Sequence, residues 1–304
     1  MTSPGKKLRE LINAPQILAM PGIFDGYSAH LVEQFGFPAG FISGAGVSES
    51  HLGQPDVGLM GMEENLRVSR AIVGCCNLPL ITDGDTGYGN AVNVYHMTRG
   101  FEQAGLGGVM IEDQVWPKRC GHMKGKQVIS AEEMVEKIKA AAEARRDPDF
   151  VIKSRTDAYT PYGLEEAIRR LNLYAEAGAD LLFADALLKE EDIATTARNV
   201  SKPLSVNMGF GIRSRPTTPL ISAKRLEDLG VAAVIYPRLL TSCAVQGMIN
   251  GLETLQKSLA TGEIIERPEL AVSFEKLNDV LGFKQFEALE QRFLTREQLQ
   301  AKYG

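Results

Sequence analysis

The feature that most constrains the fold is a repeated alternation of short apolar runs with longer amphipathic segments. Each apolar run has the length of a buried strand, and each amphipathic segment has the spacing of a helix. Strands that alternate with helices build a parallel sheet, and eight such repeats predict a closed (β/α)8 barrel. The expected strands lie at residues 17–20, 40–42, 78–82, 107–111, 150–153, 181–183, 204–206 and 233–236.

Helical patterns fill the intervals between these strands. In the longest of them, Ser130 is the expected N-cap, with acidic residues following in the first turn. Beyond Met248 the chain is helical and polar, which predicts a barrel domain over 1–248 and a helical extension over 249–304. This extension is expected to pack on the barrel or on a neighbouring subunit. The expected helices lie at 28–35, 62–73, 92–104, 130–146, 164–177, 193–200 and 223–229.

Charge and cysteine content exclude several classes of protein. The net charge is −5 with both signs mixed along the chain, so no basic face points to nucleic acid. The N-terminal segment lacks the apolar core of a signal peptide, and no run reaches the ~18 apolar residues of a membrane span. The four cysteines have neither disulfide-framework nor zinc-site spacing. We therefore expect a reduced, cytoplasmic protein that binds neither nucleic acid nor membrane.

Polar residues gather directly after the apolar runs. In a (β/α)8 barrel this is the C-terminal rim of the sheet, where active sites are built. The pattern recurs at strand after strand, which argues against coincidence. The residues concerned are Ser43, Asp83, Asp85, Glu112, Arg155, Asp185, Asn207 and Arg238.

Three of these residues form a candidate metal site. Side chains alternate along a strand, so Asp83 and Asp85 are expected on the same side of an extended chain. Glu112 ends the next strand and brings a third carboxylate. Mg²⁺ favours sites with few carboxylates that leave room for water and substrate oxygens. The alternative is that the two aspartates merely cap a turn, since the Asp85–Gly89 segment is also good turn chemistry.

The segment from Pro117 to His122 is expected to be a polar loop that carries a reactive cysteine. Cys120 is flanked by Lys118, Arg119 and His122, and these basic neighbours should lower the thiol pKa. Such a thiol is poised to give or take a proton, and the loop is long enough to act as a lid. The alternative is a basic surface loop with an incidental cysteine.

Two further features indicate anion binding. Arg155 at the end of its strand can clamp a carboxylate with two hydrogen bonds, although pairing with Asp157 is an equal alternative. The glycine-rich turn at Ser43–Gly46 offers backbone N–H groups to an anion.

Together these motifs resemble the isocitrate lyase/phosphoenolpyruvate mutase superfamily. The combination of the double-aspartate turn with the Lys-Arg-Cys-Gly-His sequence is highly specific for it. The likeness keeps the family order over roughly residues 8–295. It is carried by residues 24–29, 43–46, 53–58, 83–89, 111–114, 118–122, 155–157 and 236–237.

The resemblance implies an α/β barrel that forms a homotetramer, a dimer of dimers in which a C-terminal helix is swapped between subunits. It implies Mg²⁺, with Mn²⁺ as the alternative, and an α-oxo or α-hydroxy acid as the small anionic substrate. The metal residues would be Asp83, Asp85, Asp56 and Glu112. The substrate would contact Ser43, Gly44, Ala45, Cys120, Gly121, Arg155, Asp185 and Asn207. Cys120 would be the general acid/base, and Lys118, His122 and Arg155 the further catalytic residues.

The cysteine loop favours a lyase that cleaves a carbon–carbon bond over the phosphonopyruvate-forming mutases, whose loop differs. Phe41 and Ser242 replace a tyrosine and an arginine of the enzymes that cleave 2-methylisocitrate, which argues against a tricarboxylate substrate. Substituted malates are the expected substrates that remain. Asp185 stands where most members have glutamate, and the loop at 207–219 is longer and gains Arg213 and Arg215. These arginines are expected either to contact an anionic group of the substrate or to be solvated.

Three other functions remain open from the sequence. One is a carboxyphosphonoenolpyruvate mutase, which also carries the cysteine loop. Another is an oxaloacetate hydrolase or decarboxylase. The third is a non-catalytic protein that uses the barrel rim to hold an anion.

Overall fold

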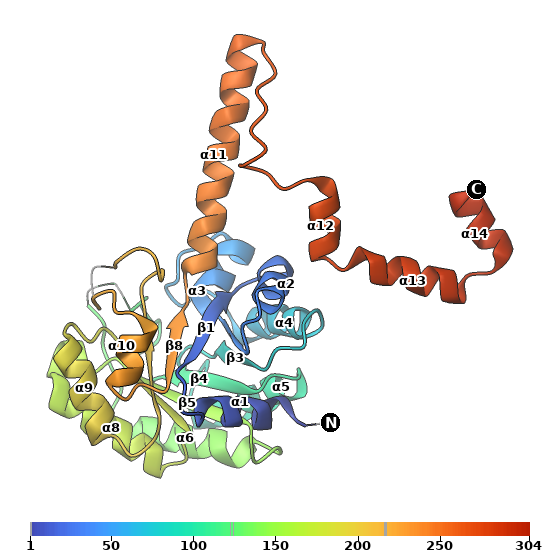
Figure 1. Ribbon diagram of the computed structural model, residues 1–304. Helices are drawn as coiled ribbons and strands as arrows, with labels where there is room; N and C mark the ends of the chain where they lie inside the picture. The colour runs from blue at the N-terminus through green and yellow to red at the C-terminus, as the bar shows by residue number, and fades with distance from the viewer. Residues whose placement is uncertain (1, 122, 124, 216–217) are drawn as a thin grey trace. The chain divides into compact units, whose positions relative to one another are not determined.

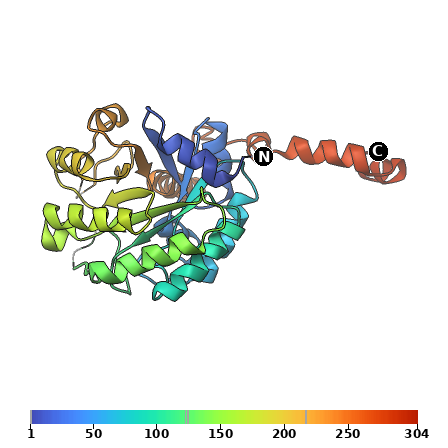
Figure 2. The same ribbon diagram turned by 90° about the horizontal axis from the view of Figure 1, so that it is seen from below.

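The computed structural model describes residues 2–121, 123, 125–215 and 218–304. Its sheet is a closed barrel of eight parallel strands in sequential order, as predicted, and helices surround it (Figures 1 and 2). The strands are β1 (Leu18–Ile23), β2 (Gly40–Ile42), β3 (Leu80–Asp83), β4 (Gly108–Glu112), β5 (Val151–Thr156), β6 (Leu181–Ala184), β7 (Leu204–Asn207) and β8 (Ala233–Tyr236).

The helices follow the strands in the expected alternation. Ser130 caps the N-terminus of α6, where its hydroxyl accepts a hydrogen bond from the Glu133 N–H at 3.1 Å. The helices are α1 (Pro4–Ile12), α2 (Gly26–Gln34), α3 (Gly44–Val47), the π-helix η1 (Ser48–Leu52), α4 (Met62–Val73), α5 (Ala91–Gln103), α6 (Ala131–Ala144), α7 (Tyr159–Tyr162), α8 (Leu164–Glu176), α9 (Glu190–Asn199), α10 (Ala223–Asp228), α11 (Leu239–Thr261), α12 (Phe274–Val280), α13 (Phe283–Phe293) and α14 (Arg296–Tyr303).

Closure of the barrel separates two apolar cores. One lies between the strands and the helix ring. The other fills the barrel interior and includes Phe41, Met110 and Phe183, together with Leu8 and Ile12 from α1. Helix α1 packs against β5, so its apolar side chains contribute to the interior core. Packing these faces removes apolar surface from water, which is the main driving force for the fold.

One local prediction is wrong. The segment Ser43–Gly46 is not a simple turn, because residues 44–47 form the short helix α3. Ser43 is its N-cap, and the Ser43 hydroxyl accepts a hydrogen bond from the Gly46 N–H at 3.2 Å. The cap compensates for the poor helix propensity of two glycines in four residues.

The chain divides into two compact units, one reaching to Ser242 and one comprising Cys243–Gly304. The boundary expected at 248/249 falls inside α11 and stays a prediction, as does a swap of the C-terminal helices between subunits. Within the second unit α12 packs on α13. No helix in the described part of the chain has the length and apolar character needed to cross a bilayer.

Candidate active site

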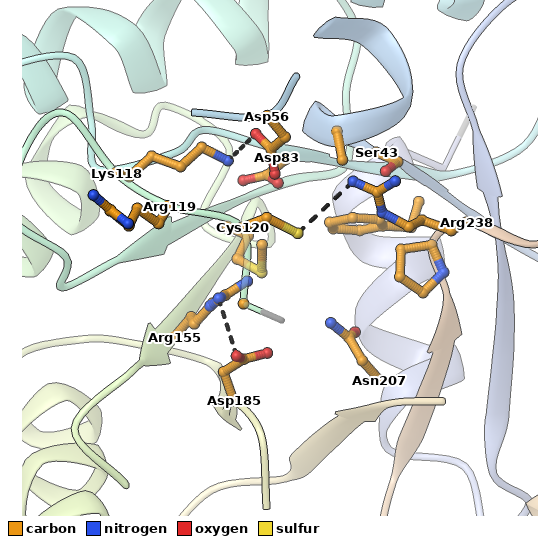
Figure 3. Close-up of a pocket in the computed structure, with 15 residues that line it drawn as sticks. Ser43, Asp56, Asp83, Lys118, Arg119, Cys120, Arg155, Asp185, Asn207 and Arg238 are labelled. Carbon is orange, nitrogen blue, oxygen red and sulfur yellow. Dashed lines mark hydrogen bonds and ion pairs between the residues drawn. The ribbon is translucent and has the colours of Figure 1, made fainter. Parts of the chain in front are cut away.

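Six of the eight residues predicted from the strand ends line one cavity at the C-terminal rim of the barrel, while Asp85 and Glu112 are not part of its lining. This cavity measures about 40 Å³, room for a few water molecules only. Figure 3 shows the side chains pointing into it from several strands and from the cysteine loop. The lining residues are Phe41, Ser43, Ala45, Asp56, Asp83, Met110, Lys118, Arg119, Cys120, Gly121, Arg155, Asp185, Asn207, Pro237 and Arg238.

One side of the cavity is acidic, and its geometry corrects a prediction. Asp83 ends β3, but Asp85 has a φ of 47° and lies in a turn, so the two do not share a face of an extended chain. The turn folds back on itself because the Asp85 N–H donates a hydrogen bond to Asp83 Oδ1 at 3.0 Å. A Cβ on Gly44 would lie 2.8 Å from Asp83 Oδ2, so only glycine allows α3 to approach this carboxylate.

A lysine ammonium lies among these acids. Lys118 Nζ forms ion pairs with Asp56 and, at 2.8 Å, with Asp85 Oδ1 (Figure 3 shows the Asp56 pair). Burial opposes the lysine charge, but the carboxylates of Asp85 and Asp56 outweigh it and raise the pKa of Lys118 well above its usual value. The acidic side thus attracts a cation, and here the chain supplies one itself.

The acids fit a hard divalent cation by their chemistry. Glu112 ends β4, is buried, and its Oε1 makes no hydrogen bond to any described residue. Burial raises the pKa of Asp85 to about 6 and that of Glu112 well above its usual value, although Lys118 and Arg155 respectively favour the charged forms. In the described part of the chain no three His, Cys, Asp or Glu side chains form a preformed cage. Mg²⁺ does not require one, since it keeps several waters.

Hydrogen bonds hold the cysteine loop, the segment from Gln114 to Val128, at its two ends and next to the site. An isolated bridge joins Gln114 to Val128, and the Gln114 side chain bonds both the N–H and the carbonyl of Arg119 at 2.9 Å. The Cys120 N–H donates to the Asp56 carbonyl at 3.2 Å, which brings the loop over the acidic side. As predicted, the described residues from 117 to 121 form neither strand nor helix. His122 lies outside the described residues.

The Cys120 thiol faces an arginine across the cavity. Cys120 is buried, and Arg238 Nη2 lies 3.7 Å from its Sγ (Figure 3). Arg238 follows β8 and also pairs with Glu49 Oε1 at 2.6 Å. Arg238 appeared among the rim residues in the sequence, but nothing there indicated that it contacts the thiol. The lowered thiol pKa expected from the sequence stays a prediction.

The opposite side of the cavity carries a network of alternating charges. Arg155 donates two hydrogen bonds to Asp157, both at 2.8 Å. The pairing with Asp157, which the sequence left open as an alternative, is therefore present. Arg155 also lies 3.2 Å from Glu112 and 3.3 Å from Asp185. Lys126 Nζ bridges Asp157 at 2.7 Å and Asp185 at 2.9 Å. Lys126 was missed in the sequence, where a lysine in a loop is an ordinary surface residue.

Two residues of the segment from Gln114 to Val128, Lys126 and Gly121, contact Asp185. Burial opposes its charge, but Arg155 and Lys126 hold the pKa of Asp185 well below its usual value. A Cβ on Gly121 would collide with the Asp185 carboxylate, so the loop backbone packs directly on this side chain. Of the remaining predicted substrate residues, Ser43, Ala45 and Asn207 line the same cavity, whereas Gly44 lies against the Asp83 carboxylate and is not part of the lining.

Comparison with known proteins agrees with this geometry. The model of the phosphoenolpyruvate phosphomutase family matches residues 8–256. The chain belongs to this family. It thus belongs to the isocitrate lyase/phosphoenolpyruvate mutase superfamily, as the sequence motifs indicated, and is an enzyme of that superfamily.

Characterised members of the superfamily and solved structures are similar to this chain over almost its whole length. The chain is 39% identical to the 2,3-dimethylmalate lyase of Eubacterium barkeri, covering 95% of this chain and 98% of that protein. A structure of oxaloacetate acetylhydrolase with 3,3-difluorooxalacetate superposes with a TM-score of 0.87 at 30% identity, and the match covers 95% of this chain and 96% of that one. The structure of phosphonopyruvate hydrolase with oxalate and Mg²⁺ superposes with a TM-score of 0.84 at 29% identity, and the match covers 97% of this chain and 100% of that one.

Proposed function

We propose that the protein is a Mg²⁺-dependent carbon–carbon lyase. Its substrate is a substituted malate, a 2-hydroxy dicarboxylate, and its products are an α-oxo acid and a second carboxylic acid. The observation that carries this proposal is the position of the Cys120 thiol, buried in one cavity between the acidic side at Asp83 and the Arg155 network. The likeness to a 2,3-dimethylmalate lyase over 95% of the chain supports it.

The acidic side is the proposed metal site. Asp83, Asp85, Glu112 and Asp56 offer oxygen ligands only, directly or through water, which suits a hard cation. The Mg²⁺ named for the phosphonopyruvate hydrolase structure supports this choice of metal. When bound, Mg²⁺ supplies Lewis-acid stabilisation of the negative charge that develops on the α-oxo acid. Lys118 neutralises the same carboxylates until then.

Cys120 is the proposed proton donor. A base removes the 2-hydroxyl proton of the substrate, and the C2–O bond becomes the carbonyl of the α-oxo acid as the carbon–carbon bond breaks. The electron pair of that bond stays on the departing acid as a carbanion, which its own carboxylate stabilises as an enolate. The thiol then protonates this carbon, and the Arg238 guanidinium 3.7 Å from Sγ stabilises the resulting thiolate. The buried position of the thiol keeps water away from the enolate.

The remaining residues orient the substrate. Arg155 would hold a substrate carboxylate through charge-assisted hydrogen bonds, and Asp157 and Asp185 fix the direction of its guanidinium. Ser43, Gly44, Ala45, Gly121, Asp185 and Asn207 complete the proposed substrate contacts. The present cavity is too small for a dicarboxylate, so the cysteine loop must lift when substrate enters.

Turnover of a small panel of acids tests this proposal. The panel contains 2,3-dimethylmalate, citramalate, 2-ethyl-3-methylmalate, oxaloacetate and phosphonopyruvate, each with Mg²⁺, with products followed by NMR. Formation of an α-oxo acid from one alkylmalate is the expected result, and EDTA or Cys120→Ser should abolish it. A protein that cleaves no malate in the panel but converts oxaloacetate or phosphonopyruvate would contradict the proposal.

Hydrolysis of oxaloacetate is the second candidate function. The TM-score of 0.87 with oxaloacetate acetylhydrolase favours it. Carboxyphosphonoenolpyruvate mutase chemistry also stays open, since the matched family takes its name from a phosphomutase. Release of acetate and oxalate from oxaloacetate would identify the hydrolase, and phosphorus NMR would identify a phosphonate product.

A further inference from the structure

A buried carboxylate lies behind the candidate active site and takes no part in the proposed reaction. Asp113 directly follows β4, is fully buried and is not part of the cavity lining. Two of its hydrogen-bond donors lie at the end of β5 and two lie on α8, so Asp113 joins the rim of the barrel to a helix outside it. These donors are the Thr156 hydroxyl at 2.7 Å, the Tyr174 hydroxyl at 2.8 Å, the Asp157 N–H at 2.9 Å and Arg170 Nη1 at 3.1 Å.

One branch of this network leads to Arg155. Asp113 Oδ1 accepts the hydrogen bond from the Asp157 N–H, and the Asp113 N–H donates to the Arg155 carbonyl at 3.2 Å. The Asp157 carboxylate in turn accepts both hydrogen bonds from the Arg155 guanidinium. The direction of the guanidinium, which binding of a substrate carboxylate requires, therefore depends on the position of Asp113.

The other branch leads to the cysteine loop. Asp113 immediately precedes this loop, and Ile129 immediately follows it. The Ile129 N–H donates to the Asp113 carbonyl at 2.9 Å, and the Ile129 carbonyl accepts a hydrogen bond from Arg170 Nη1 at 2.9 Å. The two ends of the loop therefore meet at Asp113 and Arg170. A loop that lifts to admit substrate needs such a fixed hinge.

Arg170 joins the two branches. It lies on α8 in the outer ring of helices and is not part of the cavity lining (Figure 1). Its Nη1 bonds the Asp113 carboxylate and the Ile129 carbonyl at the same time, while its Nε bonds Glu166 at 2.8 Å. A planar guanidinium holds these acceptors in fixed directions, whereas a lysine ammonium is a single point charge on a flexible stem.

We infer that Arg170 is a positioning residue for the reaction, which acts through Asp113 on the direction of the Arg155 guanidinium and directly on the hinge of the cysteine loop. This inference rests on the proposed function, because Arg155 and Cys120 take their roles from it. A change on an outer helix should therefore alter anion binding and loop opening together.

Arg170→Lys tests both branches. It keeps a positive charge beside Asp113, which favours folding, but it removes the planar set of donors. Isothermal titration calorimetry with oxalate and Mg²⁺ reports on Arg155, and amide hydrogen exchange over residues 114–128 reports on the loop. We expect at least about a tenfold loss of oxalate affinity, the usual effect of losing a charge-assisted hydrogen bond, and exchange at least about tenfold faster.

Asp113→Asn separates the two branches in a variant of almost unchanged shape. Its amide oxygen can face the three donors at Oδ2, but its NH₂ group then faces the Asp157 N–H, and that hydrogen bond is lost. The backbone carbonyl that holds Ile129 is unaffected. We expect a similar loss of oxalate affinity and unchanged exchange over residues 114–128.

Two controls separate positioning from a purely structural role. Arg169→Lys makes the same change at an exposed arginine on α8 that pairs with Glu166, and it should alter neither measurement. Tyr174→Phe removes a hydrogen bond to the same Asp113 Oδ2 but leaves those of Ile129 and Asp157 in place, so oxalate affinity should stay within about twofold.

The possible outcomes are distinct. If Tyr174→Phe loses as much oxalate affinity as Arg170→Lys, the role of Arg170 is only structural and the inference is overturned. Unchanged oxalate affinity in Arg170→Lys and Asp113→Asn, or unchanged loop exchange in Arg170→Lys, also overturns it. Failure of the unmodified protein to bind oxalate with Mg²⁺ would instead contradict the proposed function, and loop exchange in Arg170→Lys would still decide the hinge.

Discussion

Lys153 lies inside the barrel, and no acid among the described residues forms an ion pair with it. It is fully buried on β5, and its Nζ lies 5.2 Å from the ring centre of Phe41 and 4.7 Å from that of Phe183. The Nζ makes no hydrogen bond to any described residue. Burial lowers the pKa of Lys153 to about 7, although Asp83 and Asp185 favour the charged form, which Arg155 opposes. The folded state therefore binds this proton more weakly than the unfolded chain.

This residue should give the protein a rising stability above neutral pH. Between pH 7 and about 10 the unfolded chain holds the proton and the folded state has released it, so the free energy of unfolding increases with pH. The whole interval is worth on the order of 4–5 kcal/mol. Lys153→Met should flatten this slope and stabilise the protein near pH 7, as measured by urea unfolding. An unchanged slope, matching that of the exposed-residue control Lys202→Met, would contradict this expectation.

Gly121 should tolerate no side chain. Since a Cβ there would collide with the Asp185 carboxylate, Gly121→Ala must push the cysteine loop away from the rim. We expect at least a tenfold loss of kcat/KM with little change in global stability, because a small displacement of a reacting group is costly. Gly26→Ala is the matched control, since its Cβ would lie at an ordinary 3.8 Å from Cys75 Sγ. Full activity of Gly121→Ala would show that the loop need not rest on Asp185.

At the scale of elements, we expect the segment from Gln114 to Val128 to act as a lid, and ion pairs hold its C-terminal part to the rim. Its two ends are joined by the bridge between these residues, and Lys126 holds it to Asp157 and Asp185. These contacts are polar, so a polar substrate can replace them when the lid opens. Apolar contacts would be lost on opening without such a replacement.

Removing the lysine should loosen this lid. Lys126→Met leaves Asp157 and Asp185 in a buried position with less positive charge, and loss of one partner of a buried ion pair costs about 3–5 kcal/mol. Because the lid can open locally, we expect the cost to appear as faster amide hydrogen exchange over residues 114–128. Lys139→Met, on an exposed face of α6, is the control. Protection equal to that of the unmodified protein would assign the closure to other contacts.

At the scale of the whole molecule, the fold should not depend on its metal. Lys118 already neutralises Asp56 and Asp85, so the charge repulsion that would oppose folding is absent without a divalent ion. We expect EDTA to abolish turnover and to change the melting temperature little, as followed by circular dichroism. A large fall in the melting temperature with EDTA would mean that the lysine does not substitute for the ion.

The C-terminal unit exposes apolar side chains that need a partner, and we expect other copies of the chain to supply it. Its large apolar side chains are mostly exposed, among them Leu259 at 75%, Ile264 at 91% and Phe274 at 74%. A unit of this size with so little buried apolar surface has no stable core of its own. We expect a homotetramer in sedimentation equilibrium, and Phe274→Glu should weaken it. A monomer at micromolar concentration would contradict this expectation.

The sequence predicted the barrel well because strand position follows from apolar runs alone. Helix α4 and strands β2 and β8 have the expected bounds, and the other strands differ by a few residues at their ends. The sequence could not predict features set by contacts distant along the chain. The contact of Lys126 with Asp185 arises only when separate rim segments meet. The turn at Asp85, by contrast, is held by a local hydrogen bond and corresponds to the alternative that the sequence left open. The sequence could therefore predict which strand-end residues belong to the site, but not which side chains they contact there.

The turn at Phe210–Arg213 bears on how such an enzyme can diverge. The Phe210 N–H bonds the Arg213 carbonyl and Gly209 lies against that carbonyl, so the turn does not draw on the strand pairing that closes the barrel. Substitutions at its exposed positions should therefore cost little folding stability and leave Cys120 and the acidic side in place. Variants of this loop would retain the proposed reaction and exchange the acids on which it acts.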